Sequence, residues 1–280
     1  IIHAHPYVSQ IVGASCADLT GLPLVTTLHS TVETPSHKYS YSRFYDRYIC
    51  VSDEIKDFNS DKFTGTQTPI VINNCVEITG FPRYESFFRK EQLRLLFVGR
   101  LDPDKLRSLD FLLNALPAIQ RKHDVELTVV GDGAHRNEII DRASVINSKF
   151  DKRVVNVVGG SVAVHDYISE ADIVFGVGRV VLEAIAAGKF AICLGNEFYP
   201  GLVDSSVLLR ISKVNFADRN SSIRLSKQRL VRDICRVLEN FDTEFKCLSK
   251  TYDIGKERFS VENGASKHLE LYRDLIRAQL

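Results

Sequence analysis

Short apolar runs rich in β-branched residues alternate with amphipathic helical patterns along most of this 280-residue chain, and this alternation restricts the possible folds more than any other feature. Candidate strands cover residues 1–3, 24–28, 48–51, 69–72, 93–98, 126–130, 154–158, 172–175 and 190–194. Candidate helices cover residues 8–19, 53–63, 108–121, 137–150, 164–169, 180–187, 227–241 and 261–279. Strands with so few polar residues are typical of a parallel sheet covered by helices on both faces. The sequence therefore predicts an α/β fold of the doubly wound, Rossmann-like type.

A polar and aromatic stretch that includes Gly80 and Pro82 interrupts the alternation, and we interpret it as a link between two domains. We predict a partial N-terminal domain over residues 1–75, a linker over 76–92, a C-terminal domain over 93–258 and a final helix over 259–280. The first domain shows only about four strands, fewer than a complete doubly wound sheet needs. The chain also begins at Ile1 and contains no Met. We therefore expect that the front of the N-terminal domain is missing.

Composition excludes several classes of protein. The chain is 44% hydrophobic and 25% charged, which is typical of a globular protein with a substantial core. Lys plus Arg (36) nearly balances Asp plus Glu (35), so no general basic field favours nucleic acid as a partner. The six cysteines are scattered without a C-x-x-C pair, which indicates a reducing compartment. Without a signal peptide or an apolar run near the ~20 residues that span a bilayer, a cytoplasmic location is expected.

The first candidate site follows the strand at residues 93–98. Gly99 ends the apolar run, and the loop after it carries two cations, Arg100 and Lys105. Ligands of open α/β sheets bind beyond the carboxyl ends of the strands, where these side chains emerge. Arg grips phosphate in a bidentate manner and Lys adds a point charge, so the pair suits a diphosphate. The alternative is that both are solvated loop cations paired with Asp102 and Asp104.

The second candidate site lies where the strand at residues 172–175 runs through a Gly-x-Gly turn, Gly176 to Gly178, into a helix. Glycines let the backbone approach a ligand closely, and the first N–H groups of a helix carry a partial positive charge. Glu183 falls one turn into this helix among apolar neighbours. A carboxylate there needs donors, and ribose hydroxyls would supply them. The alternative is that Glu183 binds nearby backbone N–H groups or a cation.

Glycine-bearing loops also end the two strands between these sites. Residues 131–133 (GDG) and 159–161 (GGS) follow the strands at 126–130 and 154–158. Turn geometry alone explains the first loop, because glycines accept positive φ. Four consecutive strands of the second domain nevertheless deliver such loops to one edge of the sheet, and this convergence indicates a binding site more strongly than any single motif.

Histidines end two strands of the first domain. His29 follows residues 24–28 at the carboxyl end, where an imidazole could steady a leaving phosphate or contact a sugar hydroxyl; the alternative is a loop histidine satisfied by backbone. His3 and His5 alternate onto one face of a strand end, but no third ligand follows at a supporting spacing, so no metal site is expected. We interpret the remaining histidines as ordinary surface or loop residues: His37, His123, His135, His165 and His268. Neither a Gly-x-Ser-x-Gly elbow nor a Walker loop is present.

In their order along the chain, these segments resemble the family 4 glycosyltransferases, which have the GT-B architecture of two Rossmann-like domains. The resemblance rests on residues 2–5 (IHAH), 23–30 (PLVTTLHS), 48–52 (YICVS), 70–76 (IVINNCV), 97–101 (FVGRL) with Lys105, 129–133 (VVGDG), 182–184 (LEA) and 187–189 (AGK). Each segment alone is weak evidence, whereas their succession is specific.

The resemblance implies a nucleotide-sugar donor held chiefly by the C-terminal domain. By family analogy the diphosphate contacts are Arg100, Lys105, Gly178, Arg179 and Val180, the ribose contact is Glu183, and the base-side loops contribute Gly131, Asp132, Gly159, Gly160 and Ser161. His29 is the catalytic candidate near the transferred sugar, and the final helix packs back towards the N-terminal domain.

The implied activity is a hexosyltransferase-like reaction that retains anomeric configuration and needs neither metal nor cofactor. The acceptor is a glycan, a lipid or a small molecule. Family members often touch membranes through the N-terminal domain, which would place the protein at the inner face of a membrane; no basic amphipathic helix stands out in the sequence.

Three departures from the family pattern keep other functions open. Phe175 stands where the family has the first glutamate of its E-x7-E pair, and Arg179 stands where an apolar residue is common. The third departure is the expected lack of the front of the N-terminal domain, which in the family carries a glycine-rich loop. A catalytically degenerate nucleotide-sugar-binding protein, or a sugar-nucleotide epimerase of the same architecture, are the alternatives. For Arg179 we predict an additional phosphate or sugar contact.

Overall fold

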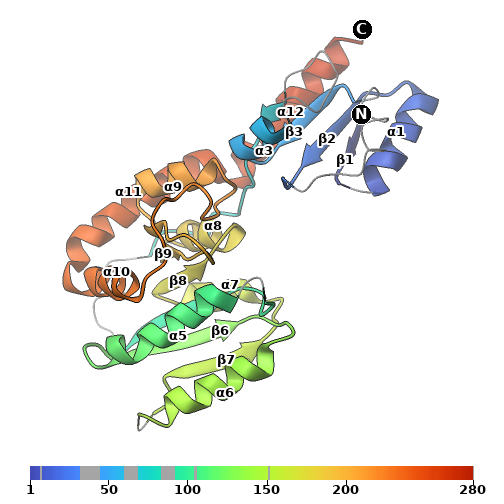
Figure 1. Ribbon diagram of the computed structural model, residues 1–280. Helices are drawn as coiled ribbons and strands as arrows, with labels where there is room; N and C mark the ends of the chain where they lie inside the picture. The colour runs from blue at the N-terminus through green and yellow to red at the C-terminus, as the bar shows by residue number, and fades with distance from the viewer. Residues whose placement is uncertain are drawn as a thin grey trace. The chain divides into compact units, whose positions relative to one another are not determined.

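The computed structural model describes residues 1–6, 8–31, 45–59, 69–82, 92–103, 106–150 and 152–279 (Figure 1). The chain divides into two compact units. The first comprises Ile1–Cys75, Ser212–Asn215 and Val261–Leu280, and the second comprises Val76–Ile211 and Phe216–Ser260. Residues 212–215 belong to the first unit although they lie far along the sequence, within the stretch that the sequence alone assigns to the second domain.

The first unit is a parallel sheet between helices. Its strands are β1 (Ile2–Ala4), β2 (Leu24–Leu28), β3 (Arg47–Cys50) and β4 (Ile70–Val71), paired in that order. Its helices are α1 (Val8–Thr20), α3 (Asp53–Asn59) and α12 (Val261–Arg277). Successive residues of a strand point to opposite faces. In β2, Leu24 accordingly packs with Ala14 of α1, whereas Val25 packs with Leu271 and Leu275 of α12.

The second unit is a larger sheet with helices on its faces (Figure 1). Its strands are β5 (Leu93–Val98), β6 (Val125–Val130), β7 (Val155–Gly159), β8 (Ile173–Gly176), β9 (Phe190–Cys193) and β10 (Gly201–Leu202). Its helices are α5 (Leu106–Gln120), α6 (Arg136–Asn147), α7 (Val164–Glu170), α8 (Arg179–Ala186), α9 (Ser205–Ser212, whose last residue belongs to the first unit), α10 (Lys227–Glu239) and α11 (Phe241–Phe259).

The strand order of the second sheet locates its ligand crevice. The order is β10-β9-β8-β5-β6-β7, with all neighbours parallel except β10 against β9. Counted from β5 as the first strand, this is the order 3-2-1-4-5-6 of a Rossmann sheet. The order reverses between β5 and β8, and ligands of such sheets bind beyond the carboxyl ends at that switch point. The predicted α/β fold with parallel sheets is confirmed.

Three elements of the second unit were not predicted from the sequence: β10, α9 and α11. Helix α11 is the largest of them and packs against α8, where a Cβ placed on Gly255 would lie 3.1 Å from the Ile185 side chain. Phe259 and Leu248 are buried on the same helix. Gly255 weakens the helical signal of the sequence, because glycine disfavours helix interiors. The close approach to α8 explains why a glycine stands there.

Among the described residues, no helix combines the length and the apolar character that crossing a membrane requires.

Candidate functional site

Arg100 leaves the sheet directly after β5, at the switch point. Its Nη1 donates to Asp102 Oδ2 at 2.9 Å, and 67% of its side chain is exposed. The contact with Asp102 is the alternative that the sequence left open for this cation. An exposed ion pair of this kind is weak, so a phosphate could replace Asp102 at little cost. Lys105, the second predicted cation, and Asp104 lie outside the described residues.

The loops after β5, β6 and β7 are bonded to one another. The Leu101 N–H donates to the Asp132 carbonyl at 2.9 Å, and the Gly131 N–H donates to the Gly159 carbonyl at 2.8 Å. A Cβ at Gly131 would overlap the Gly99 carbonyl oxygen. Only glycine therefore allows the first two loops to approach so closely. The predicted base-side residues thus form one continuous backbone surface at the carboxyl edge.

The side chains of this surface are few: Asp132 is exposed and Ser161 is half-buried. Asp132 Oδ1 accepts the N–H of Gly133 at 2.9 Å, and Ser161 Oγ accepts the N–H of Ala163 at 3.0 Å. Gly160 faces Asp132, since a Cβ on this glycine would lie 3.3 Å from the Asp132 Cβ. The side chains of Asp132 and Ser161 thus order their own loops.

The loop after β8 lies beside the end of β5. A Cβ on Gly176 would come within 3.1 Å of the Val98 carbonyl oxygen. Gly178 has a φ of 69° and caps α8, and its N–H donates to the Phe216 carbonyl at 2.7 Å. The first N–H groups of a helix have no intrahelical acceptor, which leaves those of Arg179 and Val180 available to a ligand. They carry the partial positive charge of the helix terminus.

Glu183 is paired with a cation, as one of the sequence alternatives proposed. Arg179 Nε donates to Glu183 Oε1 at 2.6 Å across one turn of α8. The arginine side chain is 71% exposed and the carboxylate 27%. The carboxylate keeps a second oxygen that can accept a hydroxyl. Phe175, at the position of the family's first glutamate, is fully buried in β8 and cannot contact a ligand.

A cavity of about 410 Å³ adjoins the ends of β8 and β9, and sequence reasoning missed the residues that shape it. Asn196 Oδ1 accepts the Ser108 N–H at 3.1 Å, at the start of α5. Asp218 Oδ2 accepts the N–H groups of Glu197 and Phe198 at 3.3 and 3.1 Å. The volume is in the range of small-ligand pockets. Gly195 after β9 was the signal available, because a fifth strand of this sheet also ends in a glycine loop.

In the first unit, His29 belongs to a connected group of aromatic and hydroxyl side chains. His5 Nδ1 and His29 Nε2 are 2.9 Å apart, and the rings of His3 and His5 stack at 4.9 Å. His3 binds on both sides, to Thr27 Oγ1 at 2.7 Å and to Tyr272 Oη at 2.6 Å. Both nitrogens of His3 are thus used in hydrogen bonds, and neither is left for a metal.

Two histidines of this group, His3 and His29, are held in the neutral state. Burial, with smaller contributions from His5, His268 and His29, lowers the pKa of His3 from 6.5 to about 4. Burial and then His5 lower the pKa of His29. Near neutral pH these rings are therefore hydrogen-bonding groups and not cations. His268, which the sequence suggested to be an ordinary surface residue, has its ring centroid 5.8 Å from that of His3.

Comparison with known proteins finds glycosyltransferases among the proteins that this chain resembles. Residues 92–207 match a family model described as glycosyl transferases group 1. Over 221 residues the chain is 27% identical to an uncharacterized glycosyltransferase of Methanocaldococcus jannaschii; the alignment covers 67% of this chain. The chain spans only 55% of the length of that relative.

Solved structures of low sequence identity share the fold. HepE of Anabaena in complex with UDP is 17% identical with a TM-score of 0.72, covering 98% of this chain and 79% of its own. Sucrose-phosphate synthase of Thermosynechococcus elongatus is 18% identical with a TM-score of 0.69, covering 99% and 74%. HepE has also been crystallised with UDP-glucose, and that complex is 18% identical with a TM-score of 0.69, covering 97% and 78%. The chain has the two Rossmann-like domains of GT-B glycosyltransferases.

Proposed function

We propose that this protein is a glycosyltransferase that moves a sugar from a nucleotide-diphosphate sugar to a glycan, a lipid or a small-molecule acceptor. The observation that carries the proposal is the switch point of the second sheet. There the loop with Arg100 and the amide end of α8 lie on neighbouring strands, β5 and β8. A cation beside a helix N-terminus is a site for a phosphate group. The family match over residues 92–207 supports the same reading.

Each part of the donor has a candidate contact in the second unit. The amides of Arg179 and Val180, with Arg100 and Lys105, would hold the diphosphate. The backbone loops at 131–132 and 159–161 would border the base. Two cations, Arg100 and Lys105, together with a helix N-terminus can offset the charge of a diphosphate. We therefore propose a metal-independent reaction.

Glu183 remains our candidate for the ribose, with a refined role for Arg179. Arg179 occupies one carboxylate oxygen, Oε1, and orients the group. A ribose hydroxyl would donate to the other oxygen, Oε2. Arg179 then acts on the nucleotide through Glu183 as well as through any direct contact with phosphate.

His29 is the catalytic candidate of the first unit. Its neutral ring, bonded to His5, can exchange a hydrogen bond with a hydroxyl of the transferred sugar. By family analogy we propose retention of the anomeric configuration and a hexosyl donor, with the leaving diphosphate assisting deprotonation of the acceptor. We place the activity in the cytoplasm, at the inner face of a membrane where the acceptor is a lipid; all six cysteines carry free thiols, as a reducing compartment allows.

A thermal-shift panel of UDP, GDP, ADP and their sugar conjugates tests the binding step. Stabilisation follows affinity by mass action, about 2.7 kcal/mol at a ligand concentration 100 times Kd. We expect one base to stabilise the protein, and Glu183→Ala to lose that stabilisation without unfolding the second unit. Glu170→Ala, an exposed glutamate at the end of α7, is the matched control. Equal shifts for wild type and Glu183→Ala would contradict the ribose contact.

Turnover tests the reaction itself. With the stabilising sugar nucleotide, an active transferase releases free nucleotide slowly through donor hydrolysis even without its acceptor. A binding protein would show affinity without any release, and that result would replace our proposal with the degenerate alternative that Phe175 suggests.

A further inference from the structure

Three side chains of types that can bind a metal ion lie close together at the edge of the second sheet opposite the donor loops. His123 lies in the turn between α5 and β6, and Cys235 and Glu239 lie on α10. Their ligand atoms are all within 4.8 Å of one another. The sequence alone predicts no metal site and treats His123 as an ordinary surface or loop residue. More than a hundred positions separate His123 from the other two. Packing of α10 against α5 brings them together.

His123 has a buried nitrogen in need of a partner. Its Nε2 is inaccessible to solvent and has no hydrogen-bond partner within the described part of the chain. The nearest carboxylate oxygen, Glu239 Oε1, is 4.0 Å away, beyond hydrogen-bond range. A buried polar atom left unpaired costs about 1–3 kcal/mol, and a bound ion is one of the ways in which proteins satisfy such an atom.

The three donors form a ligand set that zinc prefers. Thiolate sulfur, imidazole nitrogen and carboxylate oxygen bind Zn²⁺ at about 2.0–2.3 Å in a tetrahedral arrangement. Cys235 and Glu239 are four residues apart, so both project from the same face of α10. Tetrahedral bonds of these lengths separate the ligand atoms by about 3.3–3.7 Å. Glu239 is exposed and can close the remaining gap by rotating its side chain.

A fourth ligand and a suitable charge are also available. A cavity of about 750 Å³ between α5 and α10 is lined by Cys235 and Glu239 and can supply water. Thiolate and carboxylate together balance the charge of Zn²⁺. Burial raises the pKa of the Cys235 thiol, while the Lys122 ammonium lowers it. Metal binding would therefore release a proton from this thiol.

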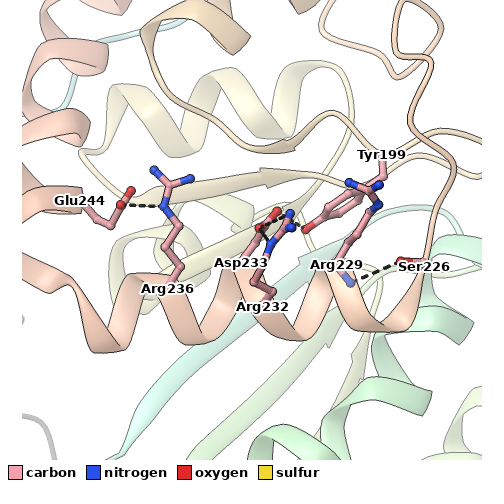
Figure 2. A network of polar contacts seen from close by, with 7 residues as sticks. All are labelled: Tyr199, Ser226, Arg229, Arg232, Asp233, Arg236 and Glu244. Carbon is pink, nitrogen blue, oxygen red and sulfur yellow. Dashed lines mark hydrogen bonds and ion pairs between the residues drawn. The ribbon is translucent and has the colours of Figure 1, made fainter.

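The two arginines of α10 that line this cavity, Arg232 and Arg236, are bonded to other carboxylates. Figure 2 shows Arg236 directed at Glu244, with Nε to Oε1 at 2.7 Å, and Arg232 at Asp233, with Nε to Oδ1 at 3.2 Å. Asp233 also accepts from Tyr199 Oη at 2.9 Å. Each guanidinium near the cavity thus has its own carboxylate, and neither competes for Glu239.

We propose that His123, Cys235 and Glu239 bind one Zn²⁺ ion, with water as the fourth ligand. The ion links the α5–β6 turn to α10 and thereby stabilises the amino edge of the sheet. β6 runs from this edge to the donor loops, a span of about 17–20 Å. The zinc site is therefore structural and independent of the proposed transfer reaction.

The decisive experiment uses the full chain, stripped with a chelator and titrated with Co²⁺ as a spectroscopic probe and with Zn²⁺. We expect one Co²⁺ per chain, with a thiolate-to-cobalt charge-transfer band and the intense visible bands of a tetrahedral site. Zn²⁺ should displace Co²⁺ and raise the melting temperature. A spectrum without a thiolate band, or no saturable binding, would overturn the proposal and would leave the transferase proposal untouched.

Single substitutions then assign the ligands. Cys235→Ser and His123→Ala should each weaken Zn²⁺ binding by more than about 100-fold, since even loss of an outer partner of a metal ligand costs 10–100-fold. Cys247→Ser and His165→Ala, which alter a half-buried thiol and an exposed imidazole of the same unit, are the matched controls and should bind like wild type. Circular dichroism verifies folding of each variant. Unchanged Zn²⁺ affinity in folded Cys235→Ser would refute the site.

Discussion

The carboxyl edges of the two sheets follow the same architecture and carry different chemistry. The second sheet presents backbone: a hydrogen bond between Gly131 and Gly159 joins two of its loops, and Gly178 caps the start of helix α8. The first sheet presents side chains, with His29 and His5 hydrogen-bonded to each other. Backbone amides and a helix terminus attract an anion, whereas neutral imidazoles exchange hydrogen bonds with hydroxyl groups. In our proposal the second edge binds the phosphates of the donor and the first binds its sugar.

The two edges also differ in the interactions that stabilise them. In the second, glycines permit loop contacts that any side chain would block. In the first, a long-range hydrogen bond between His3 and Tyr272 of α12 anchors the ring stack. Substitutions should accordingly act through sterics in one unit and through protonation and hydrogen bonding in the other. The following four predictions test this difference, from the largest expected effect to the smallest.

Gly131→Ala should be the most damaging. The new Cβ would overlap the Gly99 carbonyl, so the loops after β5 and β6 must separate, and the free energy of unfolding should fall by about 3 kcal/mol. Urea unfolding measures the loss. Gly160→Ala is the matched control, because its Cβ would meet only the exposed Asp132 side chain and should cost about 1 kcal/mol or less. Similar losses for both variants would mean that close loop packing does not hold this edge together.

Arg100→Ala should weaken donor binding by about 10–100-fold, since a hydrogen bond to a charged group contributes about 1.5–3 kcal/mol. Isothermal titration with the nucleotide found in the panel measures Kd. Arg153 is an exposed arginine just before β7, on the opposite edge, and Arg153→Ala should leave Kd unchanged. Equal affinities of Arg100→Ala and wild type would remove Arg100 from the diphosphate site.

Acid should destabilise the first unit through His3. Because its folded pKa is about 4 and its ordinary value 6.5, the unfolded chain binds the proton first. This contribution to stability is complete above pH 6.5 and is lost as the pH falls to about 4. Because the ring is only partly buried, we expect the free energy of unfolding to fall by about 1 kcal/mol over this range. Unfolding of wild type and His3→Gln at pH 7 and pH 4.5 isolates the effect; an identical pH dependence of both would contradict it.

His5→Ala should produce the smallest change, a modest rise in the pKa of His29. His5 is the lesser cause of the lowered value, and burial, the larger one, remains. Titration of the His29 ring by NMR measures the shift. His268→Ala serves as the control, since His268 acts on His3 and should not move His29. A fall in the pKa of His29 in His5→Ala would show that His5 does not repel a proton from it.

Much of the fold could be predicted from local patterns. The apolar runs at 24–28 and 93–98 have the same bounds as β2 and β5. Helix α11 was missed because Gly255 and its β-branched neighbours obscure its pattern. The sequence singled out Gly178 and Arg100 because a glycine or a cation shortly after a strand is a local signal, and their binding roles stay predictions. The ion pair between Glu183 and Arg179 could also be predicted from the sequence, since the two residues are one helical turn apart.

Contacts between distant segments were beyond such reasoning. Tyr272 reaches His3 across 269 positions. Asp218 shapes the loop after β9, and His123 meets Cys235, only because helices and loops pack in one particular way. Nothing in the local spacing of these residues indicates their partners.

The order of apolar and polar residues determined which segments become strands and helices, because each strand or helix must bury one face. The sequence also placed glycines and cations after the strands. The tertiary structure alone decided which of those ends become neighbours and which polar side chains find partners. Strand order and helix packing set those distances, and they depend on contacts summed over the whole core, which no single segment encodes.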